Sequence, residues 1–208
     1  MLIAHRDGML VGKRLPYKKR VEYLESTGTQ WIDTGIYVNN TLKTVIAFEI
    51  VDITRQGHIF GGRTVQSAGA GYGVFLSTST TGIAFDYNSR LNSNILTTNF
   101  IRYEIVKDGA TNTLDINGVR SFTGNNTAAT FSLDTTLGIF WMHQKSGTFN
   151  SVVKCRVFHF KIWNSGVLVR DLIPVIDWND EPCMYDRVSG KCFYNQGTDS
   201  FIAGPDLA

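Results

Sequence analysis

The segment from Val152 to Pro174 constrains the fold most, because it carries two runs of strand-forming residues around a tight turn. The first run, residues 152–163, is β-branched, aliphatic or aromatic apart from four basic residues, which suits a covered, pleated strand better than a helix. Residues 164–166 read Asn-Ser-Gly and supply the left-handed backbone conformations that a hairpin turn needs. The segment therefore predicts a central sheet strand that turns back and pairs with the strand after it.

The apolar face of this expected strand changes partway along it. Apolar side chains alternate on one face up to Val157 and on the other face from Phe158 onward. Such a change requires burial on both sides or a β-bulge at this point. We expect Phe160 and Trp163, and also Trp31 in a second strong strand pattern, to lie in the core.

The rest of the chain repeats strand patterns without a helical period. Asn117-Gly118, flanked by alternating apolar residues, is the strongest short hairpin signal. Further candidate strands are residues 42–51, 58–63, 72–77, 82–87, 100–107 and 137–141. About a dozen strands at spacings of roughly 8 to 12 residues or more predict an all-β, two-sheet antiparallel sandwich. A length of 208 residues fits one such domain.

Both ends of the expected sandwich carry motifs of a known group. The opening motif is YLESTGTQWIDTG at residues 23–35, and the closing motifs are DLIP at 171–174, MYD at 184–186, FY at 193–194 and GTDSFIAGP at 197–205. These motifs resemble those of a concanavalin A-like, laminin-G-like β-sandwich group of lectin type, found in phage and gut-bacterial proteins. Trp31 stands where that group usually has Tyr, and Val175 where Cys often follows the proline. The resemblance implies a jelly-roll sandwich, and it is specific for the fold rather than for a ligand.

Residues 1–20 differ from the body of the chain. They hold six basic residues against one acidic residue, whereas the remainder holds 14 basic and 17 acidic residues. We therefore divide the chain into a basic N-terminal arm, residues 1–20, and a lectin-like domain, residues 21–208. The arm is either a solvated extension or a segment that becomes ordered only against another subunit with an acidic surface.

Charge, hydropathy and cysteine content limit the partners and the compartment expected for the protein. The net charge of +2 is too small to indicate nucleic-acid binding, and no run of about 18 apolar residues predicts a membrane span. Charged residues stand where a signal peptide needs its apolar centre, so we expect assembly in a cytoplasm. The sequons at Asn39 and Asn125 are then incidental. Cys183 and Cys192 flank a turn, and in such a compartment we expect them to stay reduced.

Motifs for catalysis are not evident in the sequence. Glycoside hydrolysis needs two carboxyl groups about 5 to 9 Å apart, but Glu49 and Asp52 are expected on opposite faces of a strand, and Asp108 near Glu104 lies in a turn. The sequence holds neither Gly-x-Ser-x-Gly nor His-Glu-x-x-His, and its four histidines are dispersed. The glycines of residues 69–73 precede a strand instead of the helix that a phosphate loop requires. We predict that the protein is not an enzyme.

No cofactor is expected, with one alternative. Some laminin-G relatives hold calcium through clustered Asp and Asn oxygens. In this sequence the residues available for such a site are Asp86, Asn88, Asn92 and Asn94.

Sugar recognition needs exposed aromatic rings together with amide, carboxylate or guanidinium groups on a rigid sheet or its loops. Residues of these types at expected strand ends or loops are Arg63, Tyr72, Asp86, Tyr87, Asn88, Trp141 and His143. We take them as the candidate ligand-binding residues.

The main functional hypothesis is a non-enzymatic phage virion protein of a fibre or capsid that binds host-surface glycans and attaches to other virion subunits through its arm. A homotrimer suits a fibre. The alternatives are a bacterial carbohydrate-binding module or adhesin at the cell surface, and a purely structural interaction domain.

Overall fold

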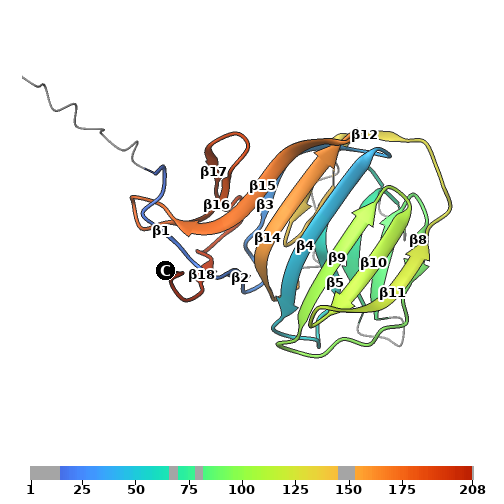
Figure 1. Ribbon diagram of the computed structural model, residues 1–208, viewed down its shortest axis with the longest axis horizontal. Coiled ribbons are helices and arrows are strands. Elements are labelled where there is room, and N and C mark those ends of the chain that lie inside the picture. Colours follow the sequence, from blue (N-terminus) through green and yellow to red (C-terminus); the bar gives the residue numbers. More distant parts are fainter. Residues whose placement is uncertain (1–14, 66–69, 78–81, 145–152, 208) are drawn as a thin grey trace, which may run out of the picture.

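Two β-sheets lie face to face in the computed structural model (Figure 1), which describes residues 15–65, 70–77, 82–144 and 153–207. Within these ranges the chain forms strands and turns, with no helix and hence no helix able to span a membrane. All strand pairs are antiparallel except one. The predicted all-β, two-sheet antiparallel architecture is confirmed, and the arrangement is consistent with a sandwich.

The larger sheet contains β1 (Lys19–Arg20), β2 (Leu24–Ser26), β4 (Leu42–Ile50), β9 (Arg102–Asp108), β10 (Thr111–Ile116), β11 (Val119–Asn125), β14 (Cys155–Asn164), β15 (Val167–Ile176), β16 (Pro182–Asp186), β17 (Lys191–Phe193) and β18 (Ile202–Ala203). Its main order is β11-β10-β9-β4-β14-β15-β16-β17. In addition β1 pairs with β15, and β2 lies between β14 and β18.

The smaller sheet contains β3 (Ile32–Asn39), β5 (Gly57–Arg63), β6 (Tyr72–Leu76), β7 (Ile83–Tyr87), β8 (Arg90–Asn92), β12 (Ser132–Ile139) and β13 (Met142–Gln144). Its order is β3-β12-β5-β6-β7-β8, and β13 pairs with β5 in the parallel direction.

Both predicted hairpins are present. The β14–β15 turn has Ser165 at φ 50° and Gly166 at φ 81°, and the β10–β11 turn has Asn117 at φ 49° and Gly118 at φ 79°. Two successive residues with positive φ give a turn whose twist matches that of the paired strands. Both turns could therefore be predicted from local sequence.

The central strand β14 contains the predicted irregularity. Val157 pairs with Phe48, whereas His159 pairs with Ala47, so Phe158 is an extra residue on β14. The bulge turns the following residues over, which places Phe160 in the core. Residue 152, where the strand was expected to begin, lies outside the described residues.

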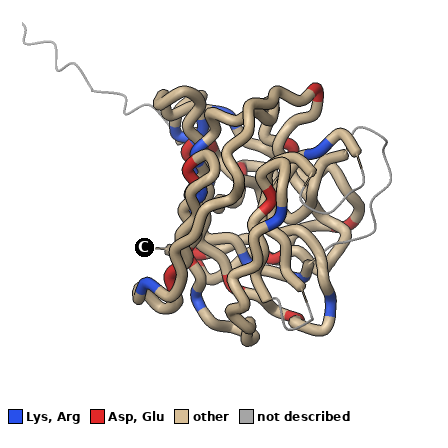
Figure 2. Tube along the Cα trace, turned by 90° about the vertical axis from the view of Figure 1, so that its right-hand side faces the viewer, with Lys and Arg blue, Asp and Glu red and all other residues tan. Residues whose placement is uncertain are grey.

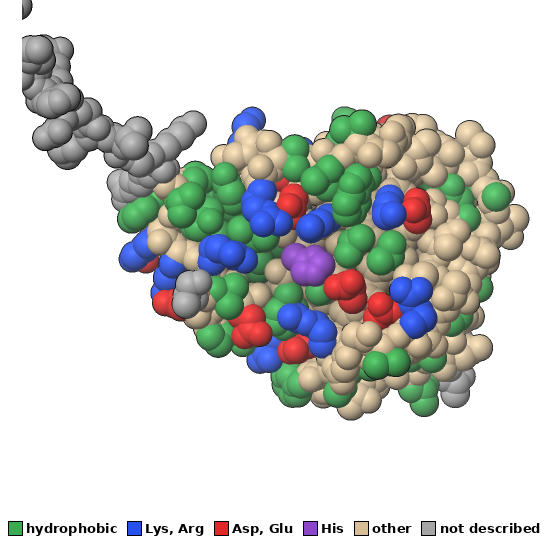
Figure 3. Space-filling model, in the orientation of Figure 1, with side chains coloured by type: hydrophobic (Ala, Val, Ile, Leu, Met, Phe, Trp, Pro, Cys, Tyr) green, Lys and Arg blue, Asp and Glu red, His purple; other side chains and the backbone are tan. Residues whose placement is uncertain are grey.

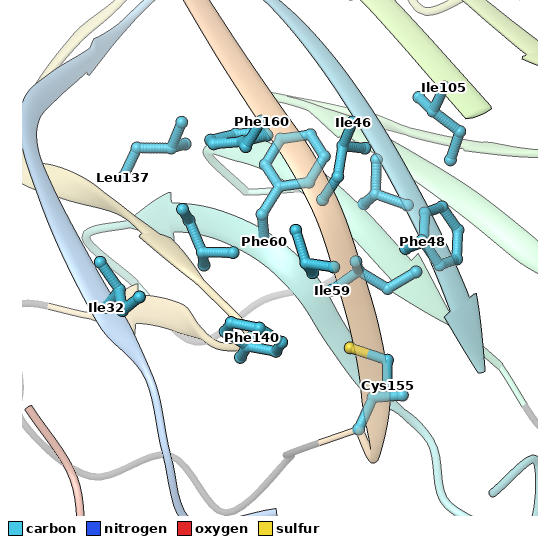
Figure 4. Packing of buried hydrophobic residues seen from close by; sticks show 14 of the residues in the cluster. Ile32, Ile46, Phe48, Ile59, Phe60, Ile105, Leu137, Phe140, Cys155 and Phe160 are labelled. Carbon is cyan, nitrogen blue, oxygen red and sulfur yellow. The ribbon is translucent and has the colours of Figure 1, made fainter. Parts of the chain in front are cut away.

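The core lies between the sheets and is rich in aromatic and aliphatic side chains (Figure 4). Phe160 of β14 is fully buried, and its ring centroid lies 5.0 Å from that of Phe60 on β5. The expected core positions of Trp31 and Trp163 are wrong, because both side chains are only partly buried. Trp163 follows the inward-facing Ile162, so the alternation of a strand turns it to the outer face.

Basic and acidic residues are interspersed along the described chain (Figure 2). On the larger sheet they form cross-strand ion pairs, such as Arg156 Nε with Glu25 Oε2 at 2.7 Å. The Arg156 and Glu25 side chains are 24% and 14% exposed, so this pair is partly buried. Because the described charges of the larger sheet are of both signs, they do not add up to a strong electrostatic field of one sign.

Residues 15–20 of the expected arm are packed on the domain. β15 extends past β14 (Figure 1), and its free edge pairs with β1, with Lys19 opposite Ile176. Tyr17, 9% exposed, packs on Ile173 and Val175, and its ring centroid lies 5.0 Å from that of Tyr185. Residues 15–20 of the predicted arm therefore pack against the predicted domain, while residues 1–14 lie outside the described residues. We call residues 15–20 the N-terminal strap.

Under the strap lie two thiols of the β16–β17 hairpin. Cys183 and Cys192 share its covered face, and both are free. Burial and the adjacent Cys192 raise the pKa of the Cys183 thiol. Because the thiolate is the reactive form, a raised pKa makes Cys183 a poor nucleophile.

Replacement of Tyr17 by alanine is expected to lower the free energy of unfolding by about 3 kcal/mol, the low end of the range for buried aromatic residues. The loss removes the apolar contact that holds the strap over β15 and β16. Denaturant unfolding followed by fluorescence measures it. Lys18→Ala is the control, because Lys18 makes an exposed ion pair with Asp180 and should contribute less than about 1 kcal/mol. Equal effects of the two changes would contradict a packed strap.

Candidate functional site

Two of the candidate ligand-binding residues face the core. Tyr72 and Tyr87 pair across β6 and β7 and are 0% and 4% exposed. The Tyr72 hydroxyl donates to Lys107 O at 2.9 Å, and the Tyr87 hydroxyl donates to Asn40 O at 2.9 Å. Burial raises the pKa of both phenols. The two rings are therefore not the exposed rings that the prediction of ligand binding assumed, because the inward-facing row of the sheet includes both.

Asp86 lies on the outer face of the smaller sheet but is fully buried there. Arg90 donates to its carboxylate from Nε at 2.8 Å and from Nη2 at 2.9 Å, and His58 Nε2 lies 3.3 Å from Oδ2. Burial alone would raise the pKa of Asp86, but the hydrogen bonds from His58 and Arg90 outweigh it and hold the pKa below its ordinary value. The carboxylate is thus already neutralised, which leaves it unsuited to bind a sugar hydroxyl.

The same contacts argue against the calcium alternative. A cation at Asp86 would have to displace Arg90, while Asn88 and Asn94 lie exposed with φ of 50° and 56° and Asn92 is exposed on β8. Among the described residues no three His, Cys, Asp or Glu side chains are grouped as metal ligands.

Arg63 and Asn88 are each held by a hydrogen bond within the protein. Arg63 is 4% exposed, and its Nε donates to Gln144 Oε1 at 3.3 Å. Asn88 is exposed in the turn between β7 and β8, where its backbone N–H donates to Gly71 O at 2.8 Å.

Trp141 and His143 do lie together, and the structure adds Trp31 to them. Ring centroids are 4.6 Å apart between Trp31 and Trp141, 5.6 Å between Trp31 and His143, and 6.4 Å between Trp141 and His143. All three rings are partly exposed. We call these three residues the aromatic cluster.

An unusual backbone turn builds one half of the cluster. Phe140 has φ 67°, which is rare for a bulky residue, and its N–H donates to Ile59 O at 2.7 Å. The buried Phe140 ring fixes this turn, after which the chain reverses so that β13 runs parallel to β5. A Cβ at Gly138 would lie 3.0 Å from Trp141 O and 3.5 Å from His143 Cβ. The glycine therefore lets β13 fold closely over β12.

The C-terminal loop holds the other half. Trp31 N donates to Asn195 Oδ1 at 3.0 Å, and Gln196 N donates to Trp31 O at 2.8 Å. A Cβ at Gly197 would lie 3.1 Å from Trp31 Cδ1. Contacts on the backbone and the ring edge thus fix the orientation of Trp31 before any ligand binds.

Polar groups surround the cluster. His143 Nδ1 lies 2.6 Å from Thr136 Oγ1, and Asp33 is paired with Gly138 on the face that carries His143. The indole Nε1 of Trp141 is buried and has no hydrogen-bond partner among the described residues. An unpaired buried N–H is costly, so this donor would gain from an acceptor that reaches it when the groups covering it move.

Sequence reasoning missed Trp31. Its strand pattern indicated the core, yet it lies directly before β3 and so belongs to the same strand-end class as the other candidates. That position was the available signal, but which loop lies beside it is set by residues 195–199, far away in the sequence.

The fold and cluster together define an all-β, two-sheet domain with a preorganised aromatic surface. No protein-family model and no curated protein matches the sequence. Among solved structures, the chain is similar to the crystal structure of a "putative carbohydrate binding protein" from Bacteroides ovatus, with a TM-score of 0.57 and 12% sequence identity. The match covers 92% of this chain and 62% of that chain. At this identity the similarity concerns the fold, and the chain spans less than two thirds of the solved structure.

Proposed function

We propose that this protein is a non-enzymatic carbohydrate-binding domain whose ligand stacks on the aromatic cluster. The observation that carries the proposal is the partly exposed Trp31–Trp141–His143 group, in which the Trp141 N–H has no partner among the described residues. Indole faces cover the apolar C–H faces of pyranose rings, and a fixed donor then selects the orientation of one oxygen.

The similarity in fold supports the same class. The Bacteroides ovatus protein is described as carbohydrate-binding, and the end motifs of this chain resemble a concanavalin A-like, laminin-G-like group. The Bacteroides ovatus neighbour favours the alternative hypothesis, a bacterial carbohydrate-binding module, over a phage virion component, whereas the resembled group includes proteins of both sources. We infer a jelly-roll order of strands from the resemblance, with a cell-surface glycan as the partner class.

Replacement of Trp141 by alanine is expected to weaken glycan binding at least tenfold, equivalent to about 1.4 kcal/mol. The change removes both a stacking ring and the unpaired donor, and fold stability should change little because the ring is partly exposed. A glycan array identifies a ligand, and isothermal titration with that glycan measures the affinity of each variant.

Two control changes separate this result from general effects. Trp178→Ala removes a tryptophan that is 45% exposed and lies in the turn after β15, so binding should persist. Glu49→Gln and Glu104→Gln should also leave binding intact and the glycan uncleaved, because Arg156 and His159 engage these carboxylates. Glycan cleavage that disappears in either glutamine variant would instead identify an enzyme, and unchanged affinity of Trp141→Ala would exclude the aromatic cluster as the site.

A further inference from the structure

The outer face of the larger sheet carries a row of side chains that the proposed site does not use. Leu168, Trp163, Lys43 and Asp108 are successive cross-strand partners on β15, β14, β4 and β9. This face is the one seen in Figure 3, where apolar side chains lie beside charged ones of both signs. Trp163 is partly exposed there, on the opposite sheet from the aromatic cluster.

A pocket of about 360 Å³ opens beside three members of this row, Trp163, Lys43 and Asp108. Its lining residues are Thr41, Lys43, Asp108, Trp163 and Gly166. The volume lies at the lower end of the range for small-molecule sites in proteins. It is therefore of a size for one sugar residue rather than for a long chain.

The pocket offers donors and acceptors in balance. Lys43 Nζ lies 3.0 Å from Asp108 Oδ2 and 5.8 Å from the centroid of the Trp163 ring. The two charged side chains are 39% and 59% exposed, so their ion pair contributes little to stability and both groups remain accessible to a ligand. A hydroxyl can donate to the carboxylate while a neighbouring oxygen accepts from the ammonium. Because the pair is neutral overall, the pocket suits a neutral polyhydroxy ligand.

The walls of the pocket are fixed before binding. Thr41 N donates to Asn39 Oδ1 at 2.8 Å and Thr41 Oγ1 donates to Asn164 Oδ1 at 2.9 Å, which ties the start of β4 to the β14–β15 turn. Gly166 in that turn has φ 81°, and a Cβ there would meet no atom within 4 Å. The turn therefore leaves open space at the rim of the pocket.

We propose that this pocket is a second sugar-binding site, which takes a neutral pyranose on the Trp163 ring with its hydroxyls on Lys43 and Asp108. The inference rests on the proposed carbohydrate-binding function and extends it. Since the two sites lie on opposite sheets, one domain would hold two glycan branches or two chains, and linked ligands would bind more tightly through effective concentration.

The test labels the four tryptophans of the intact chain with 5-fluorotryptophan and follows one fluorine resonance for each during titration. The probes are neutral methyl pyranosides, with methyl glucuronide as the charged comparison. Single Trp→Phe variants assign the resonances. We expect the Trp163 resonance to shift with a neutral probe, at a midpoint independent of the shifts of Trp31 and Trp141, while Trp178 stays unchanged.

Two variants distinguish the sites. Gly166→Asn introduces a side chain that narrows the pocket, and asparagine tolerates the left-handed backbone conformation of this position. The Trp163 shift should therefore need at least tenfold more sugar, while the Trp141 shift is retained. Trp141→Ala lacks the Trp141 resonance, so Trp31 reports on the aromatic cluster in this variant: the Trp31 shift should need at least tenfold more sugar while the Trp163 shift is retained. Shifts of Trp31 and Trp141 without a shift of Trp163 would overturn the second site alone, and a Trp163 shift without the other two would overturn the proposed function at the aromatic cluster alone. Absence of any shift with all probes would overturn both.

Discussion

Between pH 7 and pH 10.5 the free energy of unfolding is expected to rise by about 5 kcal/mol through Lys107 alone. Lys107 is 0% exposed on the inner side of β9. Its Nζ donates to Asn112 Oδ1 at 2.9 Å and lies 4.7 Å from the centroid of the Tyr72 ring. Burial, opposed only in part by the charge of Asp86, lowers the pKa of this amine from 10.5 to about 7.

The direction of this change in stability follows from the number of protons bound by the folded and unfolded states. Below pH 7 the amine is protonated in the folded and unfolded states, so the whole penalty of the buried charge is present. Between the two pKa values the folded state has lost the proton and the unfolded state has kept it. Stability therefore rises with pH across this window, by up to about 1.4 kcal/mol per unit. Urea unfolding at a series of pH values measures the slope.

A lysine-to-methionine pair isolates the effect. Lys107→Met should abolish the rise, whereas Lys161→Met should retain it, because Lys161 lies on the outer face with its side chain 35% exposed. Above about pH 9 the slope of every variant should diminish, since burial raises the pKa of the Cys155 thiol and thiols then ionise mainly in the unfolded state. Identical slopes for the wild type and Lys107→Met would show that this amine is not charged at a cost in the folded protein.

Replacement of Phe160 by alanine is expected to lower the free energy of unfolding by about 3–5 kcal/mol. The ring is fully buried and packs 5.0 Å from Phe60, so it connects the two sheets at the centre of the core (Figure 4). A cavity there removes contacts with both sheets, and neither can close it alone because its backbone is held by neighbouring strands. Denaturant unfolding with an unchanged m-value would show that stability, rather than the denatured state, has changed.

Trp163→Ala is the matched control on the same strand. The sequence pattern indicated a similar loss for both residues, but Trp163 lies on the outer face over the pocket, so we expect a loss below about 1.5 kcal/mol. Losses of equal size at the two positions would contradict the placement of Phe160 on the inner face and Trp163 on the outer face of β14.

Local sequence determined the strands and their turns. Ser165-Gly166 and Asn117-Gly118 adopt positive φ with little cost wherever they occur, and the apolar switch at Val157–Phe158 marks a bulge within one strand. Each of these features depends on residues a few positions apart. Their physical cause is therefore contained in the segment itself.

Tertiary structure decided which residues are exposed. Both faces of β6 and β7 are largely covered, so alternation could not show that Tyr72 and Tyr87 face the core while Asp86 faces outward to Arg90. Trp31 became part of a surface because residues 195–199 pack beside it.

The same holds for the two ends of the domain. The strap is ordered because β15 extends beyond the end of β14, and its unpaired edge there pairs with Lys19 and Arg20. Trp163 borders a pocket because β4 and β9 place Lys43 and Asp108 beside it. The sequence by itself determined where the chain forms strands, turns and a bulge, since these depend on backbone preferences and period-two patterning within short segments. Only the tertiary structure decided which aromatic and charged side chains meet at a surface, because that depends on pairings between segments more than 100 residues apart, such as Trp163 with Lys43.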